Sequence, residues 1–524
     1  MNKHYITLFL SLIASGTLYA QDAPTIITQP SNGETVNLYR TTKGYEGQYT
    51  GAVACQSTGD WQRLVFGNDG YVYLENPVNS FYSQSWIKGR LTDDNTIEFQ
   101  LPQAIYSEDD IFSGEKKYGY LNCMHKVTDG NTVTYKPNEA GEAQVLRYTW
   151  KDNTLTLQKQ ADDDIIGVCN DNGAWVSYGE ETSTATRVDD NYSQPSATAT
   201  VNDGLMLYMG ADETSQTYPV KYAFDGDNVY LGDLTTNLHG YWIKGEMKGN
   251  TATFPATSLL GIDTKTASYV YVSSGVMGKG VSEVGDEFDK ACLSSEPLVF
   301  TYDPSENTLS SRQMMFVHKS KDDDRSSNIF DTYRYPLISH WDKVAGRPFP
   351  PLITAYMPWD DMFGYAAIEF KLSYYSQDGD NPYLDPANLF YCLYIDGEKV
   401  EMTPDNYSRI TESMTDVPYS FDDSYDFYKL DDNNRRIYFY TEPKKTIGME
   451  AVYVDGDQRY SSGVTEYTLT DPTGVDVSDV GQKHVEKVEY TDLLGRRVNK
   501  PSKGVTVRTV TFSDGTKATT KYIR

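Results

Sequence analysis

Histidine is the side chain best suited to acid–base chemistry near neutral pH, and it is scarce in this chain. The six histidines are His4, His125, His239, His318, His340 and His484. None falls in an HExxH motif or at the short spacing with which two histidines bind zinc. A serine or cysteine nucleophile need not be close in sequence to its histidine base, so that arrangement stays open. The sequence therefore assigns no catalytic residue.

Cysteine also fails to mark a site. The five cysteines are Cys55, Cys123, Cys169, Cys292 and Cys392. They lack CxxC or any other zinc-ligand spacing, so we expect no metal site. In an oxidising compartment they allow one or two disulfides and leave at least one thiol. The chain has no P-loop, GxSxG or post-strand GxGxxG motif, and we expect no cofactor.

Carboxylates are abundant, with 74 acidic against 46 basic residues and a net charge of -28. This charge repels phosphate backbones and anionic lipid, so neither nucleic acid nor a membrane surface is an expected partner. A glycosidase needs two carboxylates at a fixed separation, which a sequence does not give. The acidic run Asp378 to Asn381 fits an ordinary turn better than a calcium loop.

Aromatic residues are the one surplus, with 43 Tyr, 19 Phe and 7 Trp. Exposed rings suit surfaces that stack on sugars or bind proteins. Alternating strands also bury rings, however, and we expect Trp86 and Trp242 to lie in the cores rather than on a ligand platform.

Two segments of the chain carry the same landmarks in the same order. The first has Val72-Tyr73-Leu74, Trp86-Ile87-Lys88-Gly89 and Asn95 to Phe99, and the second has Val229-Tyr230-Leu231, Trp242-Ile243-Lys244-Gly245 and Asn250 to Phe254. The offset stays nearly constant, at 157 (229 − 72) and 155 (250 − 95). Such order indicates a duplicated domain.

Each copy has the pattern of β-strands. Apolar and polar residues alternate in Thr96 to Leu101 and in Thr154 to Leu157, which is the period of half-buried strands. Turn residues such as Asn68-Asp69-Gly70 separate the runs. We expect two related antiparallel β-meander domains, each a barrel or a sandwich, at residues 21–165 and 201–324. A connector at 166–200 and a linker at 325–348 would follow them.

Residues 349–470 form a third series of strands. Ile368 to Leu372 alternates, Leu389 to Ile395 is strongly apolar, and Ile447 to Val454 ends at an Asp-Gly turn. Short strands between turns predict an antiparallel β-sandwich. The segment resembles fibronectin type III and immunoglobulin-like modules, although Lys445 stands where the fibronectin pattern has a corner tyrosine.

The first 20 residues have the composition of an export signal. Lys3 precedes an apolar run from Ile6 to Ala14, which is too short to span a bilayer as a helix. We predict cleavage between Ala20 and Gln21. No later stretch is apolar enough to be a transmembrane segment, so we expect an exported chain, either secreted or on the outer cell surface, with the periplasm as the alternative.

Residues 471–524 form a C-terminal tail with its own motif. The motif residues are Asp492, Gly495, Arg496, Val498, Gly504, Asp514 and Gly515. Together they resemble a shortened C-terminal sorting domain of type IX secretion in the Bacteroidota. That resemblance implies a small β fold, contact with the secretion machinery and passage to the cell surface. A plain β cap is the alternative.

Together these parts resemble large secreted multidomain proteins of the Bacteroidota. The all-β pattern, the duplication and the aromatic surplus favour a non-catalytic binding or adhesion protein whose ligand is a glycan or a host protein. Two alternatives remain. One is an extracellular hydrolase of the glycoside class with a hidden carboxylate pair, and the other is a structural component of the surface layer.

Overall fold

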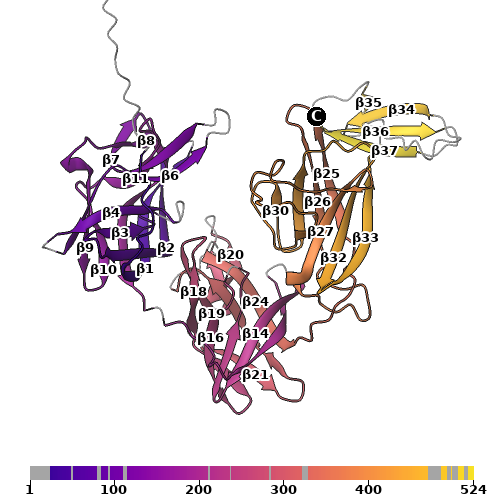
Figure 1. Cartoon of the computed structure of the whole chain (residues 1–524), viewed down its shortest axis with the longest axis horizontal. Helices are drawn as coiled ribbons and strands as arrows, with labels where there is room; N and C mark the ends of the chain where they lie inside the picture. Colours follow the sequence, from indigo (N-terminus) through magenta and orange to yellow (C-terminus); the bar gives the residue numbers. More distant parts are fainter. Residues whose placement is uncertain are drawn as a thin grey trace, which may run out of the picture. The chain divides into compact units, whose positions relative to one another are not determined.

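The computed structural model describes an all-β protein (Figure 1). It describes residues 24–48, 51–78, 84–92, 95–109, 115–189, 191–210, 213–236, 238–281, 285–321, 328–469, 485–492, 497–498, 505–512 and 517–523. Regular helix in this part of the chain is limited to short 3-10 turns, Glu142–Gln144 and Pro386–Asn388. None of these described segments is a helix long and apolar enough to cross a bilayer.

The first copy closes into an eight-stranded antiparallel barrel, here called barrel one. Its ring is β1 (Gly33–Gln48), β2 (Gly51–Gly67), β3 (Val72–Glu75), β4 (Trp86–Leu91), β5 (Thr96–Gln100), β9 (Val145–Lys151), β10 (Thr154–Gln158) and β12 (Trp175–Arg187), and β12 pairs back onto β1. The further strands are β6 (Gln103–Asp109), β7 (Lys116–Asp129), β8 (Thr132–Pro137) and β11 (Ile165–Cys169), which pair through β7 and β12. Ring closure leaves the barrel without free edges.

The second copy, barrel two, repeats this arrangement strand for strand. Its ring is β13 (Thr200–Met209), β14 (Ser215–Asp225), β15 (Asn228–Gly232), β16 (Trp242–Lys248), β17 (Thr251–Phe254), β21 (Leu298–Asp303), β22 (Thr308–Ser310) and β24 (Ile329–His340). Its further strands are β18 (Thr257–Asp263), β19 (Ser268–Val281), β20 (Glu287–Leu293) and β23 (Met314–His318). The expected pair of related β domains is confirmed, and both are barrels.

The expected connector and linker are wrong, because the closing strands of the barrels occupy them. Strands β11 and β12 lie within 165–187, and β24 lies within 325–348. The polar composition of β12 misled the prediction. Exposed Thr182, Thr184 and Thr186 alternate with buried Ser183 and Ala185, and threonine suits the outer face of a strand. Barrel one therefore extends to residue 187 and barrel two to residue 340.

Because apolar residues recur at alternate positions of the strands, each barrel has an apolar core. In β5 the buried Ile97 and Phe99 face the core of barrel one, and Phe254 of β17 does the same in barrel two. Trp86 and Trp242 are buried, as expected, but each packs in a small cluster beside the main core of its barrel.

Two antiparallel sheets after the barrels share one core and form the expected sandwich. One sheet runs β25 (Leu352–Asp360), β26 (Tyr365–Lys371), β31 (Asn434–Phe439) and β30 (Phe427–Lys429). The other runs β28 (Glu398–Lys399), β27 (Leu389–Ile395), β32 (Thr446–Asp455) and β33 (Gln458–Thr468), and β29 (Val417–Pro418) also pairs with β27.

The C-terminal tail is a four-stranded antiparallel sheet. Its order is β35 (Arg497–Val498), β34 (Val485–Asp492), β36 (Val505–Phe512) and β37 (Lys517–Ile523). Asp492 ends β34 and Val498 ends β35. The remaining motif residues and the predicted cleavage site lie outside the described residues, namely Gly495, Arg496, Gly504, Asp514, Gly515, Ala20 and Gln21.

Candidate ligand-binding site

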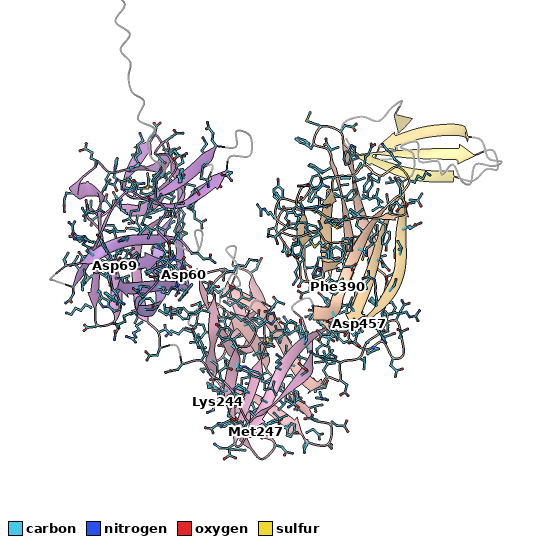
Figure 2. The ribbon with its side chains drawn as sticks, in the orientation of Figure 1. Asp60, Asp69, Lys244, Met247, Phe390 and Asp457 are labelled. Carbon is cyan, nitrogen blue, oxygen red and sulfur yellow. The ribbon has the colours of Figure 1, made fainter. Side chains whose placement is uncertain are left out.

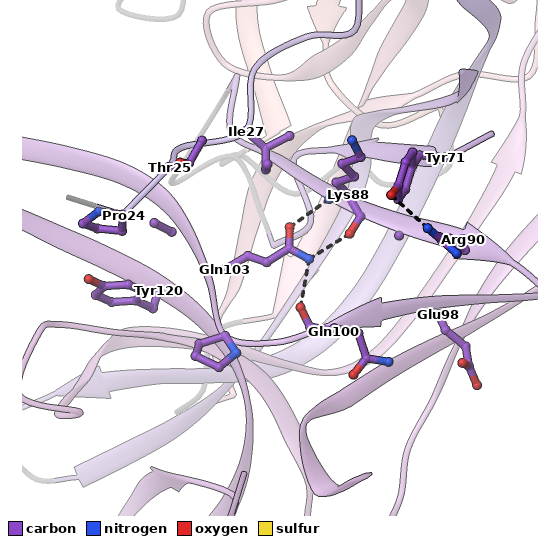
Figure 3. A pocket seen from close by; sticks show the side chains of 13 residues that line it. Pro24, Thr25, Ile27, Tyr71, Lys88, Arg90, Glu98, Gln100, Gln103 and Tyr120 are labelled. Carbon is purple, nitrogen blue, oxygen red and sulfur yellow. Dashed lines mark hydrogen bonds between the residues drawn. The ribbon is translucent and has the colours of Figure 1, made fainter. Parts of the chain in front are cut away.

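An open cavity of about 610 Å³ lies on the outer side of barrel one (Figure 3). Its polar and aromatic lining comes from separate strands: Lys88 and Arg90 from β4, Glu98 from β5, and Tyr120 from β7. Tyr71, in the turn before β3, and the segment from residue 24 to residue 27 complete it. We call this cavity the outer pocket.

Strand alternation places the two cations of β4 in the outer pocket. Lys88 and Arg90 point outward, whereas Gly89 between them faces the interior. A Cβ at Gly89 would collide with the Glu98 carbonyl and the Phe99 ring, so β4 can lie this close to β5 only with glycine there. Gly245 makes the same close approach in barrel two, so this glycine belongs to the shared architecture.

The floor of the outer pocket is fixed by one side-chain amide. Gln103 accepts a hydrogen bond from the Lys88 amide at 2.9 Å and donates to the Lys88 carbonyl at 2.8 Å (Figure 3). It also donates to the Gln100 carbonyl at 3.0 Å. Gln103 thereby pairs with β4 as a neighbouring strand would, and it fixes the backbone from which Lys88 projects.

The cations are organised around one tyrosine. Lys88 Nζ lies 3.7 Å from the centre of the Tyr71 ring, and Arg90 Nη2 donates to the Tyr71 hydroxyl at 2.9 Å. The hydrogen bond from Arg90, together with the charges of Arg90 and Lys88, lowers the pKa of Tyr71. A hydrogen bond with Tyr73 and the charge of Asp69, 3.6 Å away, raise the pKa of Lys88. Lys88 therefore keeps its charge at neutral pH.

The charge of Arg90 is open to a ligand. Within the part of the chain that the structure describes, no carboxylate lies at salt-bridge distance from its guanidinium. Glu98, the carboxylate that lines the pocket, accepts from Arg147 Nε at 2.8 Å. Arg90 carries five N–H donors and gives one to Tyr71. The outer pocket therefore offers positive charge on a strongly acidic protein.

Barrel two lacks this chemistry at the matching positions. The strand registers align Tyr71 with Asn228, Arg90 with Glu246 and Glu98 with Thr253. Lys88 keeps its type, as Lys244 (Figure 2), and Tyr120 corresponds to Tyr271, so the cation pair and the carboxylate are what barrel two lacks. Since the fold is the same in both copies, the outer pocket is not needed to build the barrel.

The structure brings one serine and one histidine together, the arrangement that the sequence left open. His318 Nε2 lies 2.8 Å from Ser273 Oγ, and Nδ1 lies 2.6 Å from the Ser320 carbonyl oxygen. Both side chains are fully buried, and Ser273 also bonds to Thr257 at 2.8 Å. Burial lowers the pKa of His318 to about 4. With no exposed atom on either side chain, this pair stabilises the core of barrel two and reaches no substrate.

The other histidines that the structure describes, His125, His239 and His340, are not brought together. His125 is exposed and pairs with Asn138 at 2.9 Å, and His340 lies 3.5 Å from the Tyr222 hydroxyl. No group of three or more His, Cys, Asp or Glu side chains is placed to hold a metal among the residues that the structure describes. In the acidic turn, Asp378 binds the Arg347 guanidinium at 2.6 and 2.9 Å, and that contact lowers the pKa of Asp378. The turn is closed by an ion pair.

All five cysteines are described, and each is a free thiol. Burial raises the pKa of Cys123, Cys169 and Cys392 to about 12 and that of Cys55 to about 11. The disulfides that the sequence allowed are not formed, because no two of these side chains meet. Such thiols are poor nucleophiles.

Comparison with protein-family models, with curated proteins and with solved structures gave no match for this chain.

Proposed function

We propose that this chain is a non-catalytic binding protein of the cell exterior, and that the outer pocket of barrel one binds a saccharide that carries a carboxylate. The observation that carries the proposal is that Lys88 and Arg90 both line a cavity of about 610 Å³. Guanidinium groups bind carboxylates with two parallel hydrogen bonds. A cavity of this size suits a small sugar.

The aromatic side of the outer pocket supports a sugar rather than a simple anion. Tyr120 lines the pocket, and burial and the charge of Asp171 raise the pKa of its phenol, which stays neutral. A neutral ring can stack on the apolar face of a pyranose. Tyr71 serves a different purpose, because Lys88 and Arg90 already occupy its ring.

The lining of the outer pocket favours binding over hydrolysis. Glycosidases of the common type need two carboxyl groups roughly 5–10 Å apart across the sugar. Among the lining residues, Glu98 is the carboxylate, and Arg147 holds it as an ion pair. The glycoside hydrolase is therefore the weaker proposal, whereas a structural role in the surface layer is tested separately, by self-assembly in solution.

Calorimetric titration of the mature chain with oligomers of a uronic acid, and with the neutral oligomers of the same backbone, tests this function. We expect binding of the acidic series only, and weakening as salt rises. Arg90→Glu, which installs the residue of barrel two, should lower the affinity at least tenfold. Lys244→Ala, at the position of barrel two that corresponds to Lys88, should leave it unchanged. Equal binding of both series, or no effect of Arg90→Glu, would refute the proposal.

Export is a separate proposal that rests on sequence alone. The apolar run before Ala20 supports signal cleavage, and the motif from Asp492 to Gly515 supports contact with a type IX secretion machinery. N-terminal and C-terminal sequencing of the protein recovered from each cell fraction tests both points. Recovery of the uncut chain from the cytoplasm would contradict them.

A further inference from the structure

Barrel one carries a layer of polar side chains inside its ring. Arg40 projects inward from β1, Gln62 and Asp60 from β2, Tyr148 from β9 and Ser183 from β12. All five side chains are buried, four of them to 1% exposure or less. We call these five side chains the inner layer.

Protein contacts account for only part of the inner layer. Arg40 Nη1 donates to the Asn76 carbonyl at 2.7 Å and lies 3.6 Å from Glu180 Oε1. Gln62 Nε2 donates to the same carbonyl at 3.1 Å. One carboxylate oxygen of Asp60 pairs with Lys319.

Several buried atoms of the inner layer have no partner within the protein. These atoms are Arg40 Nε and Nη2, Asp60 Oδ2, Gln62 Oε1, Tyr148 OH and Ser183 Oγ. A buried polar atom without a hydrogen bond is strongly destabilising, and this many in one barrel would approach the whole net stability of a domain. They require a partner that the polypeptide does not supply.

Barrel two shows that the fold does not need the inner layer. The strand registers align Arg40 with Met206, Asp60 with Tyr218, Gln62 with Val220, Tyr148 with Phe300, Ser183 with Pro336 and the neighbouring Glu180 with Tyr333. Met206, Val220, Phe300 and Tyr333 belong to the apolar core of barrel two. The copies keep the same strands and differ in the chemistry that they enclose.

We propose that barrel one encloses a binding site for a small uncharged molecule that bears hydroxyl groups. The ligand is uncharged because Glu180 balances Arg40 and Lys319 balances Asp60, so an added ion would be buried without a counter-charge. It bears hydroxyl groups because the site presents donors on Arg40 and acceptors on Gln62 and Asp60. A hydroxyl group serves both kinds at once. Internal water and the hydroxyls of a polyol share this chemistry.

Water-oxygen magnetic relaxation dispersion of the full chain tests the proposal, because it detects internal waters that exchange slowly. We compare the wild type with the triple variant Arg40→Met, Gln62→Val and Glu180→Tyr, which installs the residues of barrel two. We expect the slow-water signal to fall at least twofold. Met206→Leu in barrel two is the control and should change nothing. Gln62→Val alone spares the ion pair and should give a smaller fall if the triple variant does not fold.

A second arm distinguishes the two sources of hydroxyl groups. Amide exchange of β1, β2 and β12 is measured with and without millimolar glycerol or glucose. Greater protection in the wild type, absent from the triple variant, identifies a polyol site. An unchanged exchange rate together with the loss of slow water identifies internal water. Equal slow-water signals in the wild type and both variants, with no effect of either polyol, would overturn the proposal.

Discussion

The buried ion pair of barrel one gives the sharpest stability prediction. We consider Arg40→Met and Glu180→Tyr, singly and together, because Met206 and Tyr333 hold these positions in barrel two. Either single change removes one member of the buried ion pair, and breaking a buried pair in this way costs about 3–5 kcal/mol. The double change restores a neutral pair, and such replacements range from neutral to stabilising by about 1–4 kcal/mol.

The expected coupling follows from these magnitudes. Two single changes of at least about 3 kcal/mol each, against a double change near zero, give an interaction energy of about 6 kcal/mol or more. A tyrosine at position 180 also has a precedent. In barrel two, Tyr333 OH donates to the Leu234 carbonyl at 2.7 Å, in the loop that corresponds to the one held by Arg40.

Hydrogen exchange read by mass spectrometry is the suitable assay, because a chain of several domains has no single free energy of unfolding. Peptides of β1, β2 and β12 report on barrel one, and peptides of β13 and β24 serve as the internal reference. The single variants should lower protection in barrel one alone, and the double variant should restore it. Additive losses in the double variant would refute the reasoning, as would a single change that costs less than about 1 kcal/mol.

Three further predictions concern burial. His318 has a pKa lowered from 6.5 to about 4 by burial, so the unfolded chain takes up a proton first as the pH falls. The neutral His318 contributes fully to the stability of barrel two above pH 6.5, and about 3 kcal/mol of that stability is lost by pH 4. Hydrogen exchange of barrel two measured over a series of pH values should show this loss in the wild type and not in His318→Asn. Gly89→Ala and Gly245→Ala should each destabilise their own barrel by about 1–3 kcal/mol, because the added methyl group collides with the neighbouring strand. Hydrogen exchange in the other barrel should not change. The pKa values of Cys123 and Cys55 are raised to about 12 and about 11, so both thiols should react with an aromatic disulfide reagent at pH 8 about a hundredfold faster in urea than in the native chain. Equal rates would contradict the burial of Cys123 and the partial burial of Cys55.

Duplication made two related β domains predictable, because landmarks such as Trp86 and Trp242 recur at a nearly constant offset, but the choice between barrel and sandwich stayed open. The closing strands were missed because threonine and serine alternate in β12 without the apolar contrast that marks a half-buried strand. The sandwich was easier, since Leu389 to Ile395 is apolar throughout and is strand β27.

The outer pocket could not be found from sequence spacing. Its residues come from β4, β5, β7 and the turn before β3, and only barrel closure brings them together. The inner layer is hidden for the same reason, because Arg40 and Glu180 are 140 positions apart (180 − 40). The sequence nevertheless contains one indication of the outer pocket, which is a difference between the two copies. Aligning the two copies places Arg90 against Glu246, a reversal of charge in an otherwise matching strand.

The pairing of β1 with β12 has a consequence for how the chain acquires its shape. Thr41 pairs with Thr184, so barrel one cannot close until 143 further residues (184 − 41) have emerged, and such distant contacts form slowly. The similar strands of barrel two follow directly in the sequence, so one of them could pair in the place of the matching strand of barrel one. If β13 replaced β1, Met206 would take the place of Arg40, and Glu180 would lose the guanidinium that lies 3.6 Å away in the native barrel. The different interiors of the two barrels therefore make a barrel with an exchanged strand less stable than the native barrel.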